Sequence, residues 1–254
     1  LEWVYPMPTE LTERQKSILN AVIRDYVATA EPVASADLVR KYRLAYSPAT
    51  VRNELMALDQ AGYLAQPHTS AGSLPTDKGY RYFIAHLGDA DGLTDREERE
   101  LAALRGCTDS LEFAKQSSRL MAHLTRNLAL AGFPEEDLFY KSGLQAVMQE
   151  PEFGDLDLMH EFSALVDHIE EEVVRYFDPE DYAEPQTFIG SENPIREARR
   201  YGMIVSSLAT PFGKESLIAL VGPKRMDYQH NLAILRHFRE VLKPASYEWQ
   251  TPHS

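Results

Sequence analysis

The sequence contains a single cysteine, Cys107, among 254 residues. One cysteine excludes an internal disulfide framework and favours a reducing, cytoplasmic setting. No apolar run approaches the roughly 18 residues that a membrane-spanning helix needs, so we expect no membrane partner. The first residues lack the charged and apolar regions of a secretory signal. We therefore expect residues 1–9 to form a short N-terminal arm.

Motifs for catalysis and metal binding are also lacking. The sequence has no Gly-rich phosphate loop, no Gly-x-Ser-x-Gly segment and no paired-cysteine motif. Asp157, His160 and Glu161 share one turn of a predicted helix, but no supporting group lies nearby in the sequence. A solvated helix face explains these three residues, and we expect no catalytic residue, metal or cofactor.

The formal net charge is −13, which at first argues against a nucleic-acid partner. The charge is unevenly distributed, however. Residues 1–86 hold nine basic and nine acidic side chains, whereas residues 87–254 hold seventeen basic and thirty acidic ones. A neutral N-terminal part can still place a few cations locally against phosphates, with modest and salt-sensitive affinity.

The stretch from Ser47 to Gly62 reads as one helix with a marked beginning and end. Ser47 is a favourable N-cap, Pro48 fits the first helical position, and Gly62 suits the left-handed residue that closes a helix. A buried stripe is predicted at Val51, Leu55 and Leu58. The opposite face is short-chained and polar, as a helix in a DNA major groove requires. An ordinary surface helix is the alternative interpretation.

Two further helices are predicted before this one. The first follows a capping-box pattern at Thr12 and Gln15, and ends before Pro32. The second is short and covers residues 35–42. Two short helices joined by a tight turn, the later one with a polar outer face, are typical of a helix-turn-helix.

A short strand at residues 63–66 and a polar loop between Pro67 and Pro75 follow. After a helix-turn-helix, such a hairpin predicts a wing along the DNA backbone, where His68, Thr69 and Ser70 can donate to phosphates. A helix over residues 77–87 would add Lys78 and Arg81.

The N-terminal segments resemble the winged-helix head of the heat-inducible transcription repressor HrcA family. They are Leu11-Thr12-Glu13-Arg14-Gln15, Ala30-Glu31-Pro32-Val33, Ser47-Pro48-Ala49-Thr50-Val51-Arg52-Asn53-Glu54, Gln66-Pro67-His68-Thr69-Ser70-Ala71-Gly72 and Pro75-Thr76-Asp77-Lys78-Gly79-Tyr80-Arg81. Segments 149–153, 189–194 and 222–228 also resemble that family, in which they belong to a GAF-like domain.

Arg52 and Asn53 are the strongest candidates for reading bases, because each can form a bidentate pair with a base edge. The residues expected to contact DNA are Ser47, Ala49, Thr50, Arg52, Asn53, Met56, His68, Thr69, Ser70, Ser73, Lys78 and Arg81. The chain departs from the family at Ser73, where an Arg is usual. It also lacks the inserted segment linked to dimerisation, since residues 130–133 pass almost directly to a predicted strand at 138–140.

Beyond a hinge at residues 88–94, helices are predicted over 95–104, 110–131, 156–177 and 228–242. Positions 111, 120, 124 and 128 are expected to point inward. Strands are predicted at 187–189, 203–208 and 216–221. The fold class is therefore α+β: a winged helix-turn-helix domain over residues 10–87, then a helical linker and a reduced GAF-like domain with a small antiparallel sheet over 95–254.

The segment Gly190, Ser191, Glu192 and Asn193 follows a strand, and either rims an effector pocket or forms a structural turn. The family resemblance implies a homodimer that represses heat-shock (chaperone) genes at an inverted-repeat (CIRCE-type) operator on double-stranded DNA, and a link to the chaperonin GroEL. Two alternatives are a ligand-sensing winged-helix regulator whose GAF-like domain binds a small effector, and an enzyme or adaptor that carries the same head.

Overall fold

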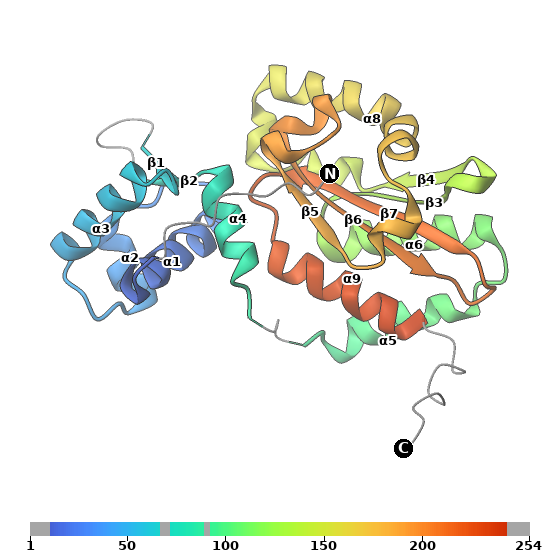
Figure 1. Cartoon of the computed structure of the whole chain (residues 1–254), viewed down its shortest axis with the longest axis horizontal. Coiled ribbons are helices and arrows are strands. Elements are labelled where there is room, and N and C mark those ends of the chain that lie inside the picture. Colours follow the sequence, from blue (N-terminus) through green and yellow to red (C-terminus); the bar gives the residue numbers. More distant parts are fainter. Residues whose placement is uncertain (1–10, 67–71, 89–91, 243–254) are drawn as a thin grey trace. The chain divides into compact units, whose positions relative to one another are not determined.

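The computed structural model describes residues 11–66, 72–88 and 92–242. The chain divides into two compact units, residues 1–88 and 89–254, each with its own core (Figure 1). Among the described residues, no helix is both long enough and apolar enough to cross a membrane.

The first unit is a group of helices with a short two-stranded ladder. Its elements are α1 (Glu13–Thr29), α2 (Ser35–Tyr42), α3 (Pro48–Gln60), β1 (Leu64–Ala65), β2 (Leu74–Pro75) and α4 (Asp77–Ala85). The predicted capping box at Thr12 and Gln15 begins α1. The hydroxyl of Ser47 accepts from the amide of Thr50 at 3.1 Å and begins α3. Gly62 follows α3 with a φ of +77°, as the helix-stop prediction required.

The core of the first unit lies between α1 and the inner stripe of α3. Ile18 and Val22 of α1 and Val51 and Leu58 of α3 are all fully buried. Gly72 has a φ of +89°, and a Cβ there would lie 2.9 Å from backbone atoms of the segment before α2. Glycine is therefore required where the hairpin returns to the helices.

The second unit is built on a five-stranded antiparallel sheet in the order β4-β3-β7-β6-β5. Its strands are β3 (Leu128–Phe133), β4 (Leu138–Ser142), β5 (Gln186–Ile189), β6 (Tyr201–Ala209) and β7 (Glu215–Pro223). Its α-helices are α5 (Asp95–Ala103), α6 (Ser110–Thr125), α7 (Leu144–Val147), α8 (Leu156–Tyr176) and α9 (Tyr228–Leu242). Short 3₁₀ turns occupy Leu104–Gly106, Pro134–Glu136, Pro151–Gly154, Pro179–Tyr182, Gly190–Glu192 and Arg196–Arg200.

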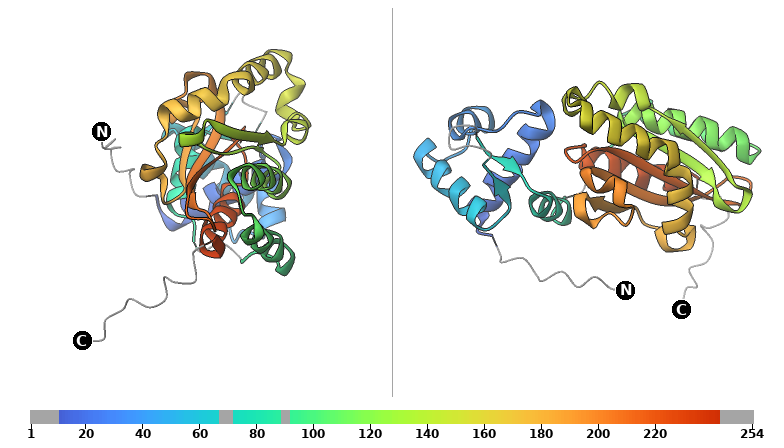
Figure 2. Two further views of the ribbon diagram at one scale, coloured as in Figure 1. Left: turned by 90° about the vertical axis from the view of Figure 1, so that its right-hand side faces the viewer. Right: turned by 90° about the horizontal axis from the view of Figure 1, so that it is seen from above.

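Helices cover both faces of this sheet (Figures 1 and 2). On one face, Phe162 and Ile169 of α8 pack with Met203 and Val205 of β6. On the other face, α6 and α9 contact the sheet, and the Tyr228 side chain of α9 lies against Gly202 of β6. The mixed α+β composition and the antiparallel sheet agree with the sequence prediction.

The predicted helix over residues 110–131 is wrong in its last third. Helix α6 ends at Thr125, Arg126 adopts a left-handed conformation with φ +57°, and β3 begins at Leu128. All six residues of β3 are buried, because its two faces are both covered. A strand of this kind shows no alternation of polar and apolar residues, so its periodicity cannot be distinguished from that of a buried helix.

The predicted inward face of this helix is also wrong at position 111. The Leu111 side chain is 51% exposed, whereas Phe113, Ala114, Ser117 and Met121 are buried. The buried face thus contains small and polar residues, which a search for leucines at helical spacing overlooks.

Candidate nucleic-acid interface

The candidate interface is the outer face of α3. Arg52, Asn53 and Met56 are exposed on this face, and Met56 is 49% exposed although it is apolar. Val51 and Leu55 on the opposite side are buried, so the helix shows two distinct faces.

The beginning of α3 carries positive partial charge that no acidic side chain of its first turn offsets. Ala49 is exposed there and has almost no side chain, so a ligand can approach the backbone. The hydroxyls of Ser47 and Thr50 lie 2.9 Å apart and complete the cap. These two hydroxyls therefore stabilise the end of the helix that would meet DNA, in addition to any contact of their own.

Two of the cations near α3, Arg43 and Arg52, differ from the others in their side-chain contacts. Within the described part of the first unit, no ion pair or hydrogen bond engages the side chains of Arg43 and Arg52. By contrast, Arg40 pairs with Asp37, and Lys41 with Asp25. Sequence reasoning missed Arg43, which lies in the turn before α3 with φ +49°. An exposed cation at a left-handed helix end, in the connection between two predicted helices, was the signal that could have identified it.

The hairpin residues predicted to contact phosphates are only partly placed. His68, Thr69 and Ser70 lie outside the described residues. The prediction for Ser73 is corrected, because this side chain is 1% exposed. Its backbone forms two 3.0 Å hydrogen bonds with that of Val33, which draws the residue into the interior.

Lys78 is exposed, as a DNA contact requires, and it also has an internal partner. Its ammonium group donates to the carbonyl oxygen of Ala61 at 2.8 Å and lies 4.3 Å from the centre of the Tyr63 ring. A cation at this position stabilises the carbonyl end of α3. Arg81, further along α4, is partly buried.

The segment from Gly190 to Asn193 forms a self-contained turn after β5. The Glu192 carboxylate accepts from the amide of Ile189 at 3.0 Å. The Asn193 side chain, 1% exposed, accepts from the amide of Ile195 at 3.1 Å, and Arg199 donates to the Asn193 carbonyl at 3.1 Å. These bonds support the structural-turn interpretation.

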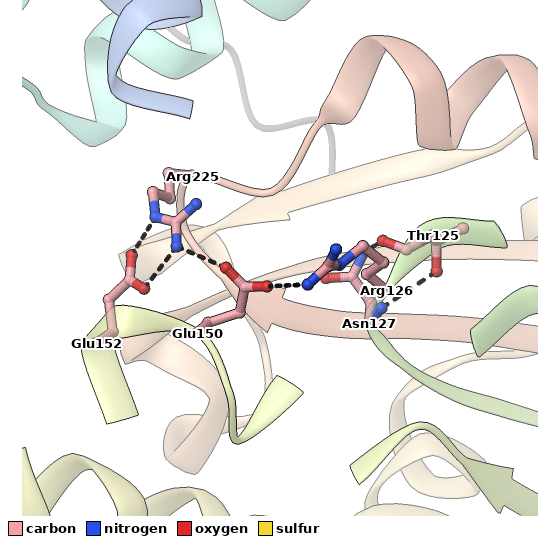
Figure 3. A network of polar contacts seen from close by, with 6 residues as sticks. All are labelled: Thr125, Arg126, Asn127, Glu150, Glu152 and Arg225. Carbon is pink, nitrogen blue, oxygen red and sulfur yellow. Dashed lines mark hydrogen bonds and ion pairs between the residues drawn. The ribbon is translucent and has the colours of Figure 1, made fainter. Parts of the chain in front are cut away.

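A charged network joins two of the segments singled out in the sequence, 149–153 and 222–228 (Figure 3). The Arg225 guanidinium donates to Glu152 at 2.6 and 2.9 Å and to Glu150 at 2.7 Å. Although burial acts against the charge, these two carboxylates raise the pKa of Arg225 above its usual value. Arg126 adds a 3.7 Å contact to Glu150. The network connects the turn before α9 to the turn before α8.

Among the residues that the structure describes, no three His, Cys, Asp or Glu side chains converge as a metal site would require. Glu161, one of the acidic residues considered from the sequence, instead forms hydrogen bonds of 2.9 and 2.8 Å with Arg200. This pair connects α8 to the segment before β6.

Comparisons with known proteins show which family this chain is similar to. Residues 93–231, more than half of the chain, match the family model described as the HrcA protein C terminal domain. The chain is 46% identical over 125 residues to the heat-inducible transcription repressor HrcA of Thermobifida fusca (strain YX). The aligned residues make up 49% of this chain and 36% of that relative. It is 46% identical over 125 residues to the protein of the same name from Streptomyces albus G, covering 49% and 37%.

The aligned part thus spans little more than a third of the length of these curated relatives. A solved structure described as a hypothetical protein at 2.2 Å resolution matches with a TM-score of 0.68 and 15% identity, over 92% of this chain and 98% of that one. This likeness shows that the fold occurs in an experimentally determined protein.

Proposed function

Because this chain belongs to the HrcA family, we propose that it is a cytoplasmic, sequence-specific DNA-binding repressor of heat-shock genes. Relatives that are 46% identical over about half of this chain carry the name heat-inducible transcription repressor. Under this proposal the first unit is a winged helix with α3 as its recognition helix. The second unit is a reduced GAF-like regulatory domain.

One observation carries the proposal. The outer face of α3 presents an arginine and an asparagine with a small residue at its beginning, and the described part of the chain offers Arg52 no internal partner. Arginine pairs with guanine and asparagine with adenine in the major groove, and a small neighbour permits close approach. The positive charge of Arg43 and the positive partial charge at the beginning of α3 both suit contacts with adjacent phosphates.

We further propose that the protein acts as a homodimer on a CIRCE-type inverted repeat. Two-fold symmetry would place the two copies of α3 in successive major grooves about 34–36 Å apart. The bound dimer would then block transcription. Sedimentation of the chain with and without the inverted-repeat duplex tests this, and one chain per duplex would contradict it.

The decisive experiment is a titration of the chain against the inverted-repeat duplex and an unrelated duplex of equal length. Replacing both Arg52 and Asn53 by Ala should reduce operator affinity by at least tenfold, because each bidentate base contact contributes about 1–3 kcal/mol of discrimination. Arg96→Ala is the matched control, since Arg96 is an exposed arginine of α5. Unchanged operator affinity in the double variant would refute the proposal.

The chaperonin GroEL is proposed as the regulatory partner. The hypothesis is that heating removes the binding-competent state and that chaperonin availability sets how much of it returns. Operator binding is measured after a heat step, with and without GroEL. Equal recovery in both samples would reject this regulatory part while leaving the DNA-binding part intact.

A further inference from the structure

We propose that the ion pair between Arg14 of α1 and Glu54 of α3 sets the rotation of α3 about its own axis, and so decides which side chains face the bases. The inference rests on the proposed function, because it assigns positioning residues to the same DNA-binding surface. Neither residue is itself proposed to touch DNA.

The pair is directional and partly enclosed. The Arg14 Nε donates to the Glu54 carboxylate at 2.7 Å, and a terminal nitrogen of the same guanidinium contacts the same carboxylate oxygen. The Glu54 side chain is only 12% exposed. A carboxylate that is buried to this degree needs its partner, so the two side chains hold a fixed relative position.

Glu54 lies on the inner side of α3. With 3.6 residues per turn, Glu54 points about 160° away from Arg52. Rotating the helix to move Glu54 relative to Arg14 would therefore turn Arg52 and Asn53 by the same angle in the groove. A restraint on the inner face is thus transmitted directly to the outer face.

Arg14 also contacts the entry to α3. Its guanidinium carbon lies 5.9 Å from the centre of the Tyr46 ring, and Tyr46 immediately precedes the cap residue Ser47. A cation above an aromatic ring is attracted to it at this distance. One arginine therefore contacts both the beginning and the middle of the same helix.

The remaining inner contacts of α3 are less specific about rotation. Val51, Leu55 and Leu58 are apolar, and hydrophobic burial has no preferred direction. Apolar packing holds the helix on α1, whereas a polar pair with defined geometry can select one orientation from several of similar packing energy. Buried polar pairs serve this purpose in helical assemblies whose register a single polar residue fixes.

The test replaces the pair by apolar side chains of similar length, as Arg14→Met with Glu54→Leu, which avoids an unpaired buried charge. The matched control is Glu13→Leu with Lys16→Met. Glu13 and Lys16 both belong to α1, and their charged groups lie 2.7 Å apart. They carry one charge of each sign, as Glu54 and Arg14 do, and the Glu13 side chain is exposed to solvent. Circular dichroism melting identifies whether each variant is folded.

The first readout needs no DNA. Backbone amide chemical shifts should change along the whole of α3, as far as the exposed positions Ala49 and Gln60, which lie five and six residues from Glu54, and by more than in α4. The control variant should leave α3 unchanged. Shifts limited to the neighbours of the mutated residues would overturn the inference, whether or not the chain binds DNA.

The second readout is the ratio of affinities for the inverted-repeat duplex and a duplex with changed bases. The ratio should fall by about tenfold in the Arg14 and Glu54 double variant, with affinity for the changed duplex nearly constant. Arg14→Lys keeps the charge but loses the guanidinium geometry, so its affinity ratio should lie between that of the double variant and that of the wild type. A ratio equal to the control's would overturn the inference. A wild-type ratio of one would instead refute the proposed function, and the amide shifts would still decide the rotation.

Discussion

Tyr201 is a polar side chain held in apolar surroundings. It is 1% exposed, its hydroxyl donates to the Leu158 carbonyl at 2.9 Å, and its ring lies 4.9 Å from that of Phe162. Burial raises the pKa of Tyr201 to about 12, and the nearby carboxylate of Glu161 contributes in the same direction. The neutral phenol is therefore built into the packing between α8 and β6.

This pKa predicts a loss of stability at alkaline pH. Below pH 10 the phenol is protonated in both states, whereas between about pH 10 and pH 12 only the unfolded chain releases its proton. The free energy of unfolding should then fall as the pH rises through this range, and Tyr201→Phe should show a shallower fall. Urea titrations at several pH values measure this. Tyr176→Phe, at an exposed tyrosine, should retain the wild-type slope.

Residues with local partners could be predicted from the sequence, and those with distant partners could not. The caps at Thr12 and Ser47 depend on residues three positions away, so sequence spacing was sufficient to find them. Glu54 depends on a partner forty residues earlier, and Ser73 on a bridge to Val33. No local pattern contains such information. The role of Glu54 was therefore missed, and Ser73 was predicted to lie on the DNA-binding surface.

At the scale of elements, α3 depends on its cap. Ser47→Ala should lower the free energy of unfolding of the first unit by about 1 kcal/mol, because the amide of Thr50 loses its hydrogen-bond partner. Urea unfolding measures the change. Ser163→Ala is the comparison, since its exposed hydroxyl accepts from no helix-end amide and bonds a carbonyl within α8. A smaller loss for Ser47 than for Ser163 would contradict the role of the cap.

The connection between the turns before α8 and α9 depends on Arg225. Arg225→Met should destabilise the second unit by about 3 kcal/mol, because two partly buried carboxylates would lose their counter-charge. Adding Glu150→Gln and Glu152→Gln should recover part of the loss. Urea unfolding of both variants tests this, and equal stabilities for the two would show that charge is not the cause.

Elements were predicted well where their periodicity is clear. The helices at 228–242 and 35–42 have the bounds expected from the sequence, since each has one buried and one exposed face. β3 was mistaken for the end of a helix because the sheet and its covering helices bury the strand on every side. The pattern that identifies an element disappears when no face of it meets solvent.

At the scale of the whole molecule, the uneven charge predicts how DNA binding responds to salt. Few cations of the first unit lack internal partners, so the logarithm of the binding constant should fall only shallowly with the logarithm of salt concentration. Arg43→Gln should reduce the size of this slope by about 1 per bound chain, with equal loss of affinity for all sequences. Titrations at several salt concentrations measure it. Arg96→Gln should leave the slope unchanged, and an unchanged slope for Arg43→Gln would exclude a phosphate contact.

Under the proposed function, the inner anchoring of α3 separates two tasks of one helix, reading bases and holding its own position on α1. Side chains at positions 49, 52, 53 and 56 point outward, whereas Glu54 fastens the helix to α1 from behind. A designer who wishes to retarget the protein to a new operator can therefore randomise the outward positions and leave position 54 alone. Libraries that also vary Glu54 would yield binders whose preferred bases are harder to forecast, because the orientation of the reading face would change together with its chemistry.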